Sequence, residues 1–147
     1  MKTIFNPATR SAIVSRIGDV SSGARPKWGK MNSEEMLTHL INGLRMAIGE
    51  LSPRPKKLPI RYTPLRQLIV YLAPWPRNAP TAPELLPSNP VAIEEAKREL
   101  LRLIEDVGGR GAQREWPEHP AFGPLGRRGW GVVVWKHLDH HLRQFGV

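Results

Sequence analysis

Three of the five histidines of this chain lie in its last twelve residues, KHLDHHLRQFGV. On an α-helix each residue turns by about 100°, so His137 and His141 would lie about 40° apart and about 6 Å along the axis. This i,i+4 spacing lets two imidazoles bind one metal ion, as in helical HxxxH zinc sites. His140 would lie at the edge of the same face, and Asp139 on nearly the opposite side as a surface charge.

Two histidines do not complete a metal site, so a third ligand must come from elsewhere, and His39 and His119 are the candidates. His39 falls in the middle of a predicted helix, at the edge of its apolar stripe, where an unpaired polar ring costs roughly a few kcal/mol. A metal ion shared between two helices would satisfy it. Spacing alone leaves an alternative open. The HxxxH pattern could arise by chance, and its histidines would then be hydrogen-bonded in the core without a metal ion.

The chain has 147 residues and no cysteine. This length predicts one domain, residues 1–147, with a single core. Without cysteine there is no disulfide, no thiolate-bound zinc and no cysteine nucleophile, so a metal ion must take nitrogen and oxygen ligands. Any thiol chemistry would need a thiol from outside the chain.

A formal charge of +9 is typical of proteins that bind nucleic acid or an anionic membrane, but here the basic residues are spread along the whole chain. Their densest patch is Arg54, Lys56, Lys57 and Arg61, in a proline-containing segment with no helical face and no interleaved aromatic residues for stacking on bases. We therefore expect a solvated basic surface and no nucleic-acid partner. No apolar run approaches the ~20 residues of a membrane span, and the first residues lack a signal peptide's apolar region. These patterns predict a cytoplasmic protein with no membrane partner, and a homodimer is left open.

The elements that must position the histidines are predicted to be helices. Asn6 and Pro7 start a helix that ends near Gly18. Asn32, with Glu35 three residues later, forms a capping box, and apolar residues at helical spacing continue to Gly49. This second helix carries His39.

A proline-rich crossover follows over residues 52–90, and only Leu65 to Ala73 in it could form a short apolar helix. The next helix is predicted to begin with Asn89 as its cap and to end at Gly108 and Gly109. The last helix is predicted over residues 130–145, although its three consecutive valines locally favour a strand. The expected fold class is therefore all-α, a four-helix bundle with a long proline-rich crossover between the second and third helices.

Three separated blocks carry a resemblance to a known family: WGKMNSEEMLTHL (residues 28–40), EHPAFGPLG (118–126) and WKHLDHHLRQFG (135–146). They resemble the DinB/YfiT-like superfamily of metal-binding four-helix bundles, and more narrowly a bacterial branch filed as a domain of unknown function. The resemblance runs from about residue 5 to the C-terminus. Arg143 stands where much of the superfamily has glycine, and Gly126 where a capping Ser or Thr is expected.

The resemblance implies one ligand from the second helix and two, four residues apart, from the last helix. His39, His137 and His141 match these positions, and His140 is then a neighbour. The role of His119 stays open among an added ligand, a substrate contact and a hydrogen-bonded loop anchor, of which the anchor is preferred.

Three neutral imidazoles leave a divalent ion its full charge and an open coordination position, which is typical of catalytic sites. The expected metal is zinc or nickel, with iron as a further candidate. Some members of the superfamily are transferases or isomerases that use low-molecular-weight thiols. The resemblance therefore implies a metal-dependent thiol transferase with an external thiol as cofactor and a small-molecule substrate. The alternatives are a metal-dependent hydrolase with the same three ligands and a non-catalytic basic binding module. No catalytic base is identified in the sequence.

Overall fold

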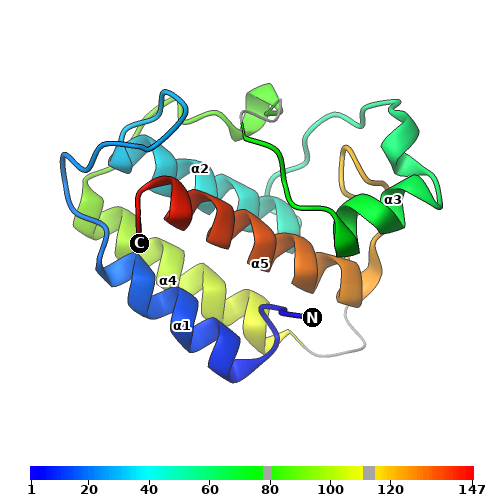
Figure 1. The fold of residues 1–147 in the computed structure, drawn as a ribbon, viewed down its shortest axis with the longest axis horizontal. Coiled ribbons are helices and arrows are strands. Elements are labelled where there is room, and N and C mark those ends of the chain that lie inside the picture. Colours follow the sequence, from blue (N-terminus) through cyan, green and yellow to red (C-terminus); the bar gives the residue numbers. More distant parts are fainter. Residues whose placement is uncertain (78–80, 111–114) are drawn as a thin grey trace.

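Regular secondary structure in this protein is helical. The computed structural model describes residues 1–77, 81–110 and 115–147, and within these ranges no strand forms, only one isolated bridge between His119 and Gly123. The four long helices run along the long axis of the molecule (Figure 1). They are α1 (Pro7–Gly18), α2 (Ser33–Ile48), α4 (Ile93–Gly109) and α5 (Gly126–Gln144). None of the helices in the described ranges is both long and apolar enough to span a membrane.

The first two helices start at the predicted caps. The side-chain oxygen of Asn6 accepts a hydrogen bond from the backbone N–H of Thr9 at 2.9 Å, and Pro7 occupies the first helical position. At α2, Asn32 accepts from the N–H of Glu35, and the Glu35 carboxylate accepts from the N–H of Asn32, both at 2.8 Å. This reciprocal pair is the predicted capping box. It fixes the start of the helix that carries His39.

The predicted starts of the other two long helices are wrong. Helix α4 begins at Ile93 after an extended Ala92, so Asn89 is not its cap. Residues 87–92 form no helix, and Val91 among them packs against the core. Helix α5 begins at Gly126, about one turn earlier than predicted, without a side-chain cap. Its valines, Val132 to Val134, are helical and buried. The predicted helix is therefore confirmed, and the local preference of valine for strands does not decide the structure here.

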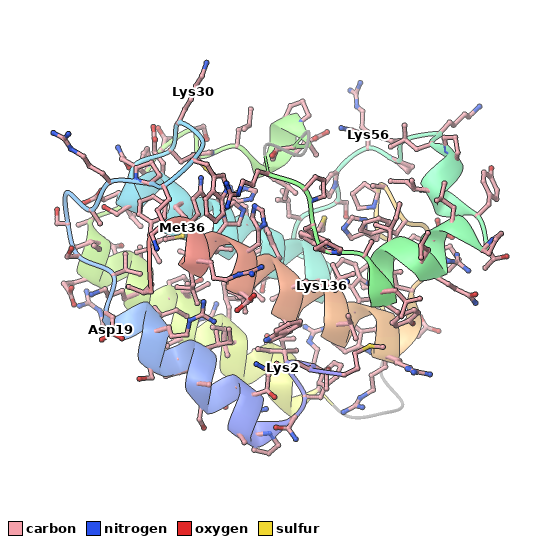
Figure 2. The ribbon with its side chains drawn as sticks, in the orientation of Figure 1. Lys2, Asp19, Lys30, Met36, Lys56 and Lys136 are labelled. Carbon is pink, nitrogen blue, oxygen red and sulfur yellow. The ribbon has the colours of Figure 1, made fainter. Side chains whose placement is uncertain are left out.

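The core lies between the four long helices, where α2 contacts both α4 and α5, and α1 contacts the same two helices. Figure 2 shows Met36 of α2 inside the molecule, whereas Lys30 and Lys56 extend outward. The indole of Trp130 on α5 is buried and donates to the Pro117 carbonyl oxygen at 2.8 Å. The side chains that are essentially inaccessible to solvent include Ile13, Ile17, Leu37, Leu40, Leu100, Leu103, Ile104, Leu138 and Leu142.

Asp139 is not the free surface charge that its helical position predicts. Its carboxylate pairs with Arg16 of α1 at 2.7 Å and with Arg143 on the next turn of α5 at 3.1 Å. The Asp139 side chain is only 18% exposed. This pair therefore ties α1 to the histidine-bearing end of α5.

In the described parts of the crossover between α2 and α4, residues 49–77 and 81–92, the helical pieces are short. They are η1 (Pro59–Arg61), α3 (Leu65–Gln67), the π-helical turn η2 (Leu68–Leu72) and η3 (Pro83–Leu85). The consecutive α3 and η2 confirm the predicted short apolar helix. Lys136 of α5 donates to the carbonyl oxygens of Ile69 and Ala73, so the crossover is fixed against α5 beside His137.

Candidate metal centre

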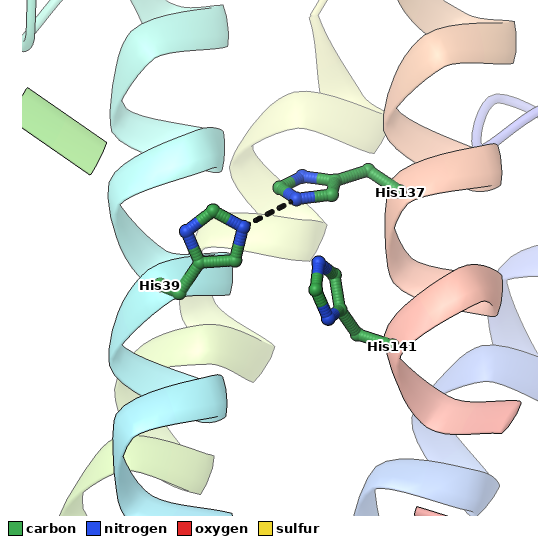
Figure 3. A group of neighbouring side chains, drawn as sticks. All are labelled: His39, His137 and His141. Atoms are coloured by element: carbon green, nitrogen blue, oxygen red, sulfur yellow. Dashed lines mark hydrogen bonds between the residues drawn. The ribbon is translucent and has the colours of Figure 1, made fainter. Parts of the chain in front are cut away.

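The imidazoles of His39, His137 and His141 meet between α2 and α5. Figure 3 shows the rings facing one another across the gap between the two helices. Their ring centroids lie 4.8 to 4.9 Å apart in all three pairings. One nitrogen from each ring lies within 4.8 Å of the other two. The three residues expected to be ligands are therefore brought together.

The orientation of His39 is set by the crossover. Its Nδ1 lies 2.9 Å from the carbonyl oxygen of Leu85, in η3. A carbonyl oxygen only accepts hydrogen bonds, so Nδ1 carries the proton and donates it. The Nε2 atom of His39 is then left with a free lone pair toward the other two rings.

His141 is oriented in the same way by Gln144, one turn later on α5. The Gln144 amide nitrogen donates to the Trp28 carbonyl oxygen, so its Oε1 must face His141. Oε1 lies 2.7 Å from His141 Nδ1, which therefore donates to it. His141 Nε2 is left as the lone-pair atom. Such outer hydrogen bonds fix the tautomer of metal-binding histidines.

His137 completes the group through a contact with His39. The two Nε2 atoms lie 2.8 Å apart, as the dashed line in Figure 3 marks. Because His39 Nε2 carries no proton, His137 Nε2 donates to it in the metal-free protein. The His137 ring also lies against Gly43 of α2, where a Cβ atom would stand 2.8 Å from His137 Cε1. The missing side chain at Gly43 makes room for this imidazole.

Burial keeps the three rings neutral. It lowers the pKa of His39 despite the hydrogen bond to Leu85, and lowers that of His141 to about 3. The pKa of His137 lies well below 6.5, first because of burial and then because of the neighbouring His39. Metal ions bind the neutral imidazole, so near pH 7 the lone pairs are available without loss of a proton.

The donor set fits a first-row divalent ion. Imidazole nitrogens bind such an ion tetrahedrally at about 2.0–2.1 Å, which separates the nitrogens by roughly 3.4 Å. The closest pair here is 2.8 Å apart and the whole set lies within 4.8 Å, so the observed distances bracket that value. Three imidazoles suit zinc, nickel or iron, whereas calcium and magnesium prefer oxygen ligands.

Comparison with known proteins places the chain in a family. The profile of the family described as Protein of unknown function (DUF1569) matches residues 9–146, which include all three histidines. The chain belongs to the DUF1569 family. No curated protein and no solved structure gives a significant match.

In this DUF1569 chain the triad opens into a cavity of 740 Å³. The walls of the cavity are mostly apolar and come from α2, α5, the crossover and the loop before α5. Trp75 lies beside His137 with ring centroids 5.8 Å apart, and Phe122 packs against Trp75. No acidic side chain lines the cavity among the described residues, and lysines such as Lys30 and Lys56 do. This is a volume typical of a small-molecule site.

The other two histidines do not join the triad, although both line the cavity. His140 stacks edge-on against Trp28 and lies beside His141. His119 anchors its loop, because its Nδ1 accepts hydrogen bonds from the N–H groups of Ala121 and Phe122. These are the hydrogen bonds that the preferred interpretation of His119, a loop anchor, predicts.

Sequence reasoning missed three supports of the site: the Leu85 carbonyl, Gln144 and the open space at Gly43. Gln144 follows His141 by three residues, a helical spacing that places it beside that histidine. This signal was available in the sequence. Leu85 and Gly43 carry no comparable signal, since their roles depend on how the crossover and α5 lie against α2.

A second hollow of 630 Å³ lies between α2 and α4. Its side chains are mostly polar and charged, and Glu99 in it is paired with Arg45 and Arg102. The hydrogen bond from Arg102 lowers the pKa of Glu99 to about 2. These pairs satisfy one another, and the hollow contains no histidine.

Proposed function

We propose that this protein is a divalent-metal-binding four-helix bundle of the DinB/YfiT-like type that transfers a low-molecular-weight thiol to a small molecule. The observation that carries the proposal is the convergence of His39, His137 and His141 in the wall of a largely apolar cavity. Zinc or nickel is the expected ion, with iron as a further candidate. The reaction takes place in the cavity beside the triad.

The residues of the chain prepare the site before any ligand enters. Leu85 and Gln144 hold two of the rings with their Nε2 lone pairs toward one point. The apolar walls exclude water from the reacting atoms, which strengthens electrostatic interactions inside. A bound divalent ion supplies Lewis acidity, lowering the pKa of a thiol or a water molecule so that either becomes a nucleophile near neutral pH.

An external thiol is the preferred nucleophile for two reasons. The chain has no cysteine that could compete for the ion. The superfamily that the sequence resembles also includes thiol-dependent transferases. In the proposed step the thiol sulfur forms a bond to an electrophilic carbon, the leaving group departs with its electron pair, and the thiol proton passes to solvent.

The first experiment tests the metal site. Untagged protein expressed with zinc, nickel and iron supplied should carry about one equivalent of a first-row ion by mass spectrometric metal analysis. His39→Ala, His137→Ala and His141→Ala should each lose it, while His140→Ala should keep it as the matched control. Metal-free wild type, or triad variants that retain the ion, would refute the site.

The second experiment tests the reaction. A panel of low-molecular-weight thiols is offered with 1-chloro-2,4-dinitrobenzene, and thioether formation is measured by absorbance. Conjugation should require both the metal and the intact triad. If no thiol reacts but activated esters are hydrolysed in a metal-dependent way, the hydrolase alternative replaces thiol transfer. If neither reaction occurs and the protein binds nucleic acid with a steep salt dependence, the basic binding module is correct.

A further inference from the structure

Large hydrophobic side chains are exposed mainly on the crossover. Of the seven strongly exposed ones among the described residues, five lie between residues 58 and 72, the others being Met1 and Leu86. Tyr62 is 69% exposed, Leu68 49% and Leu72 74%. Exposed apolar groups that gather in one place mark interaction surfaces.

These side chains share one side of a short helix. Leu65, Leu68 and Leu72 follow one another at spacings of three and four along α3 and η2, so they project from one face. The opposite side of this helix contains Val70, which is buried against Phe122 and Val133. We call Tyr62, Leu65, Leu68 and Leu72 the crossover apolar face. In Figure 1 the helix that carries most of it lies at one end of the molecule, outside the four long helices.

The same segment is strongly basic. Residues 51–77 contain six basic residues and no acidic residue: Arg54, Lys56, Lys57, Arg61, Arg66 and Arg77. Of these, Arg61 is paired with Glu118 at 2.9 Å. Arg54 and Lys57 are exposed, and Lys56 extends outward in Figure 2. Arg66 belongs to α3 itself, and η1, which carries Arg61, contacts α3, so these two cationic residues lie beside the apolar side chains. Arg77 lies over the ring of Trp28 instead.

A second copy of the chain is a poor partner for this face. In a two-fold dimer the same patch meets itself, so Arg66 of each copy would be brought close to the other, and segment 51–77 supplies no acidic residue to pair with it. A surface rich in negative charge removes this repulsion. The face is also formed by a projecting helix, which suits insertion between lipid headgroups better than holding another helix.

We propose that the crossover apolar face docks on an anionic lipid bilayer, with the basic residues of segment 51–77 against the headgroups. Tyr62 and the three leucines enter the interface, and the charges add attraction that is weakened by salt. This surface contact goes beyond the sequence analysis, which expected a solvated basic surface and no membrane partner. It is independent of the proposed metal chemistry, since none of these side chains touches the triad.

The proposal is tested by co-sedimentation of the full-length protein with vesicles. Vesicles of phosphatidylcholine mixed with phosphatidylglycerol should pull down the protein at low salt, whereas pure phosphatidylcholine should retain far less. Raising the salt concentration should release it. Equal binding to both vesicle types, or binding to neither, would overturn the proposal.

Matched variants assign the binding to this face. The double variant Leu68→Gln, Leu72→Gln should lower the vesicle partition coefficient about tenfold or more, because two leucines leave the interface. Leu86→Gln, at a leucine exposed elsewhere, should change it little. Arg54→Gln should lower it about fivefold, as expected for one charge near an anionic surface. The exposed Arg25, on a different loop, supplies the control Arg25→Gln.

Light scattering separates lipid docking from self-association. All variants replace exposed side chains, so their circular dichroism and melting temperatures should match the wild type. If the wild type is a dimer and the double variant is a monomer, with vesicle binding unchanged, the face is a protein interface and the lipid proposal is wrong.

Discussion

The His137 ring occupies the space that a side chain at Gly43 would fill. A Cβ atom at Gly43 would lie 2.8 Å from His137 Cε1 and 2.9 Å from its Nδ1. Contacts under about 3 Å force one group to move, and the ring is the movable one. Gly43 thus governs where the third imidazole of the triad lies.

Gly43→Ala should weaken metal binding without unfolding the protein. Alanine favours a helix over glycine by about 1 kcal/mol, which offsets part of the roughly 1 to 3 kcal/mol that overpacking costs in a core, so the melting temperature should fall only slightly. Displacement of the His137 ring should lower the metal affinity by about tenfold or more, as does the loss of groups that orient a metal ligand. Competition with a chromogenic chelator measures the affinity. Gly18→Ala is the matched control, because a Cβ there meets nothing within 4 Å.

Gln144→Leu should loosen His141. The substitution removes the oxygen that receives the His141 Nδ1 proton and also the hydrogen bond to the Trp28 carbonyl. Loss of such outer hydrogen bonds lowers metal affinity about 10- to 100-fold. Calorimetric titration of zinc into the metal-free protein measures the change. Unchanged affinity would show that Gln144 does not orient a ligand.

The stability of the metal-free protein should fall as the pH drops below about 6.5. Burial lowers the pKa of His119 to about 3 in the folded state, against an ordinary value of 6.5. Between these values the unfolded chain binds a proton at His119 that the folded chain does not, so the free energy of unfolding decreases with falling pH. Urea titrations at a series of pH values measure this slope.

His119→Asn isolates the contribution of that histidine. An asparagine oxygen can accept the same N–H groups of Ala121 and Phe122 but does not titrate. Above about pH 7 the variant should keep most of its stability. On acidification its free energy of unfolding should fall less steeply than that of the wild type, because its unfolded chain binds one proton fewer. His119→Ala, which lacks the acceptor, should be destabilised at every pH. An unchanged slope in His119→Asn would mean that His119 protonates freely in the folded protein.

Asp139→Asn should destabilise the protein by about 1 to 2 kcal/mol. The change removes charge from a carboxylate that is mostly covered and bonded to both Arg16 and Arg143. Glu105→Gln is the control. Because Glu105 is 65% exposed in its pair with Arg10, this substitution should lower the free energy of unfolding by less than about 0.5 kcal/mol. Urea denaturation compares the two variants. Equal effects would show that Asp139 does not link α1 to α5.

Helix ends that are fixed by residues close in the sequence could be predicted from the sequence. The capping box at Asn32 and Glu35 is formed within one turn, so it could be recognised without knowing the rest of the fold. The helical spacing of His137 and His141 likewise needs only the helix itself. Their convergence with His39 was expected from the resemblance and from the need to satisfy a buried ring.

Features that depend on distant contacts were not predictable in this way. Asn89 and Pro90 have the residue types of a helix start, but Val91 packs on the core in a non-helical stretch and delays α4 to Ile93. The Leu85 carbonyl meets His39 only because the crossover folds back over α2. The exposure of the crossover leucines was also not predictable. A helical pattern of apolar residues does not tell which face of the helix packs against the rest of the protein.

The neighbouring rings of Trp75 and His137, with centroids 5.8 Å apart, give the protein an optical reporter. Indole fluorescence is quenched by ions with partly filled d shells, such as nickel, through energy transfer over short distances. Zinc has a filled d shell and leaves the emission largely intact. The tryptophan emission of the protein should therefore fall more with nickel than with zinc during a titration, and Trp75→Phe, which leaves four other tryptophans, should reduce that difference.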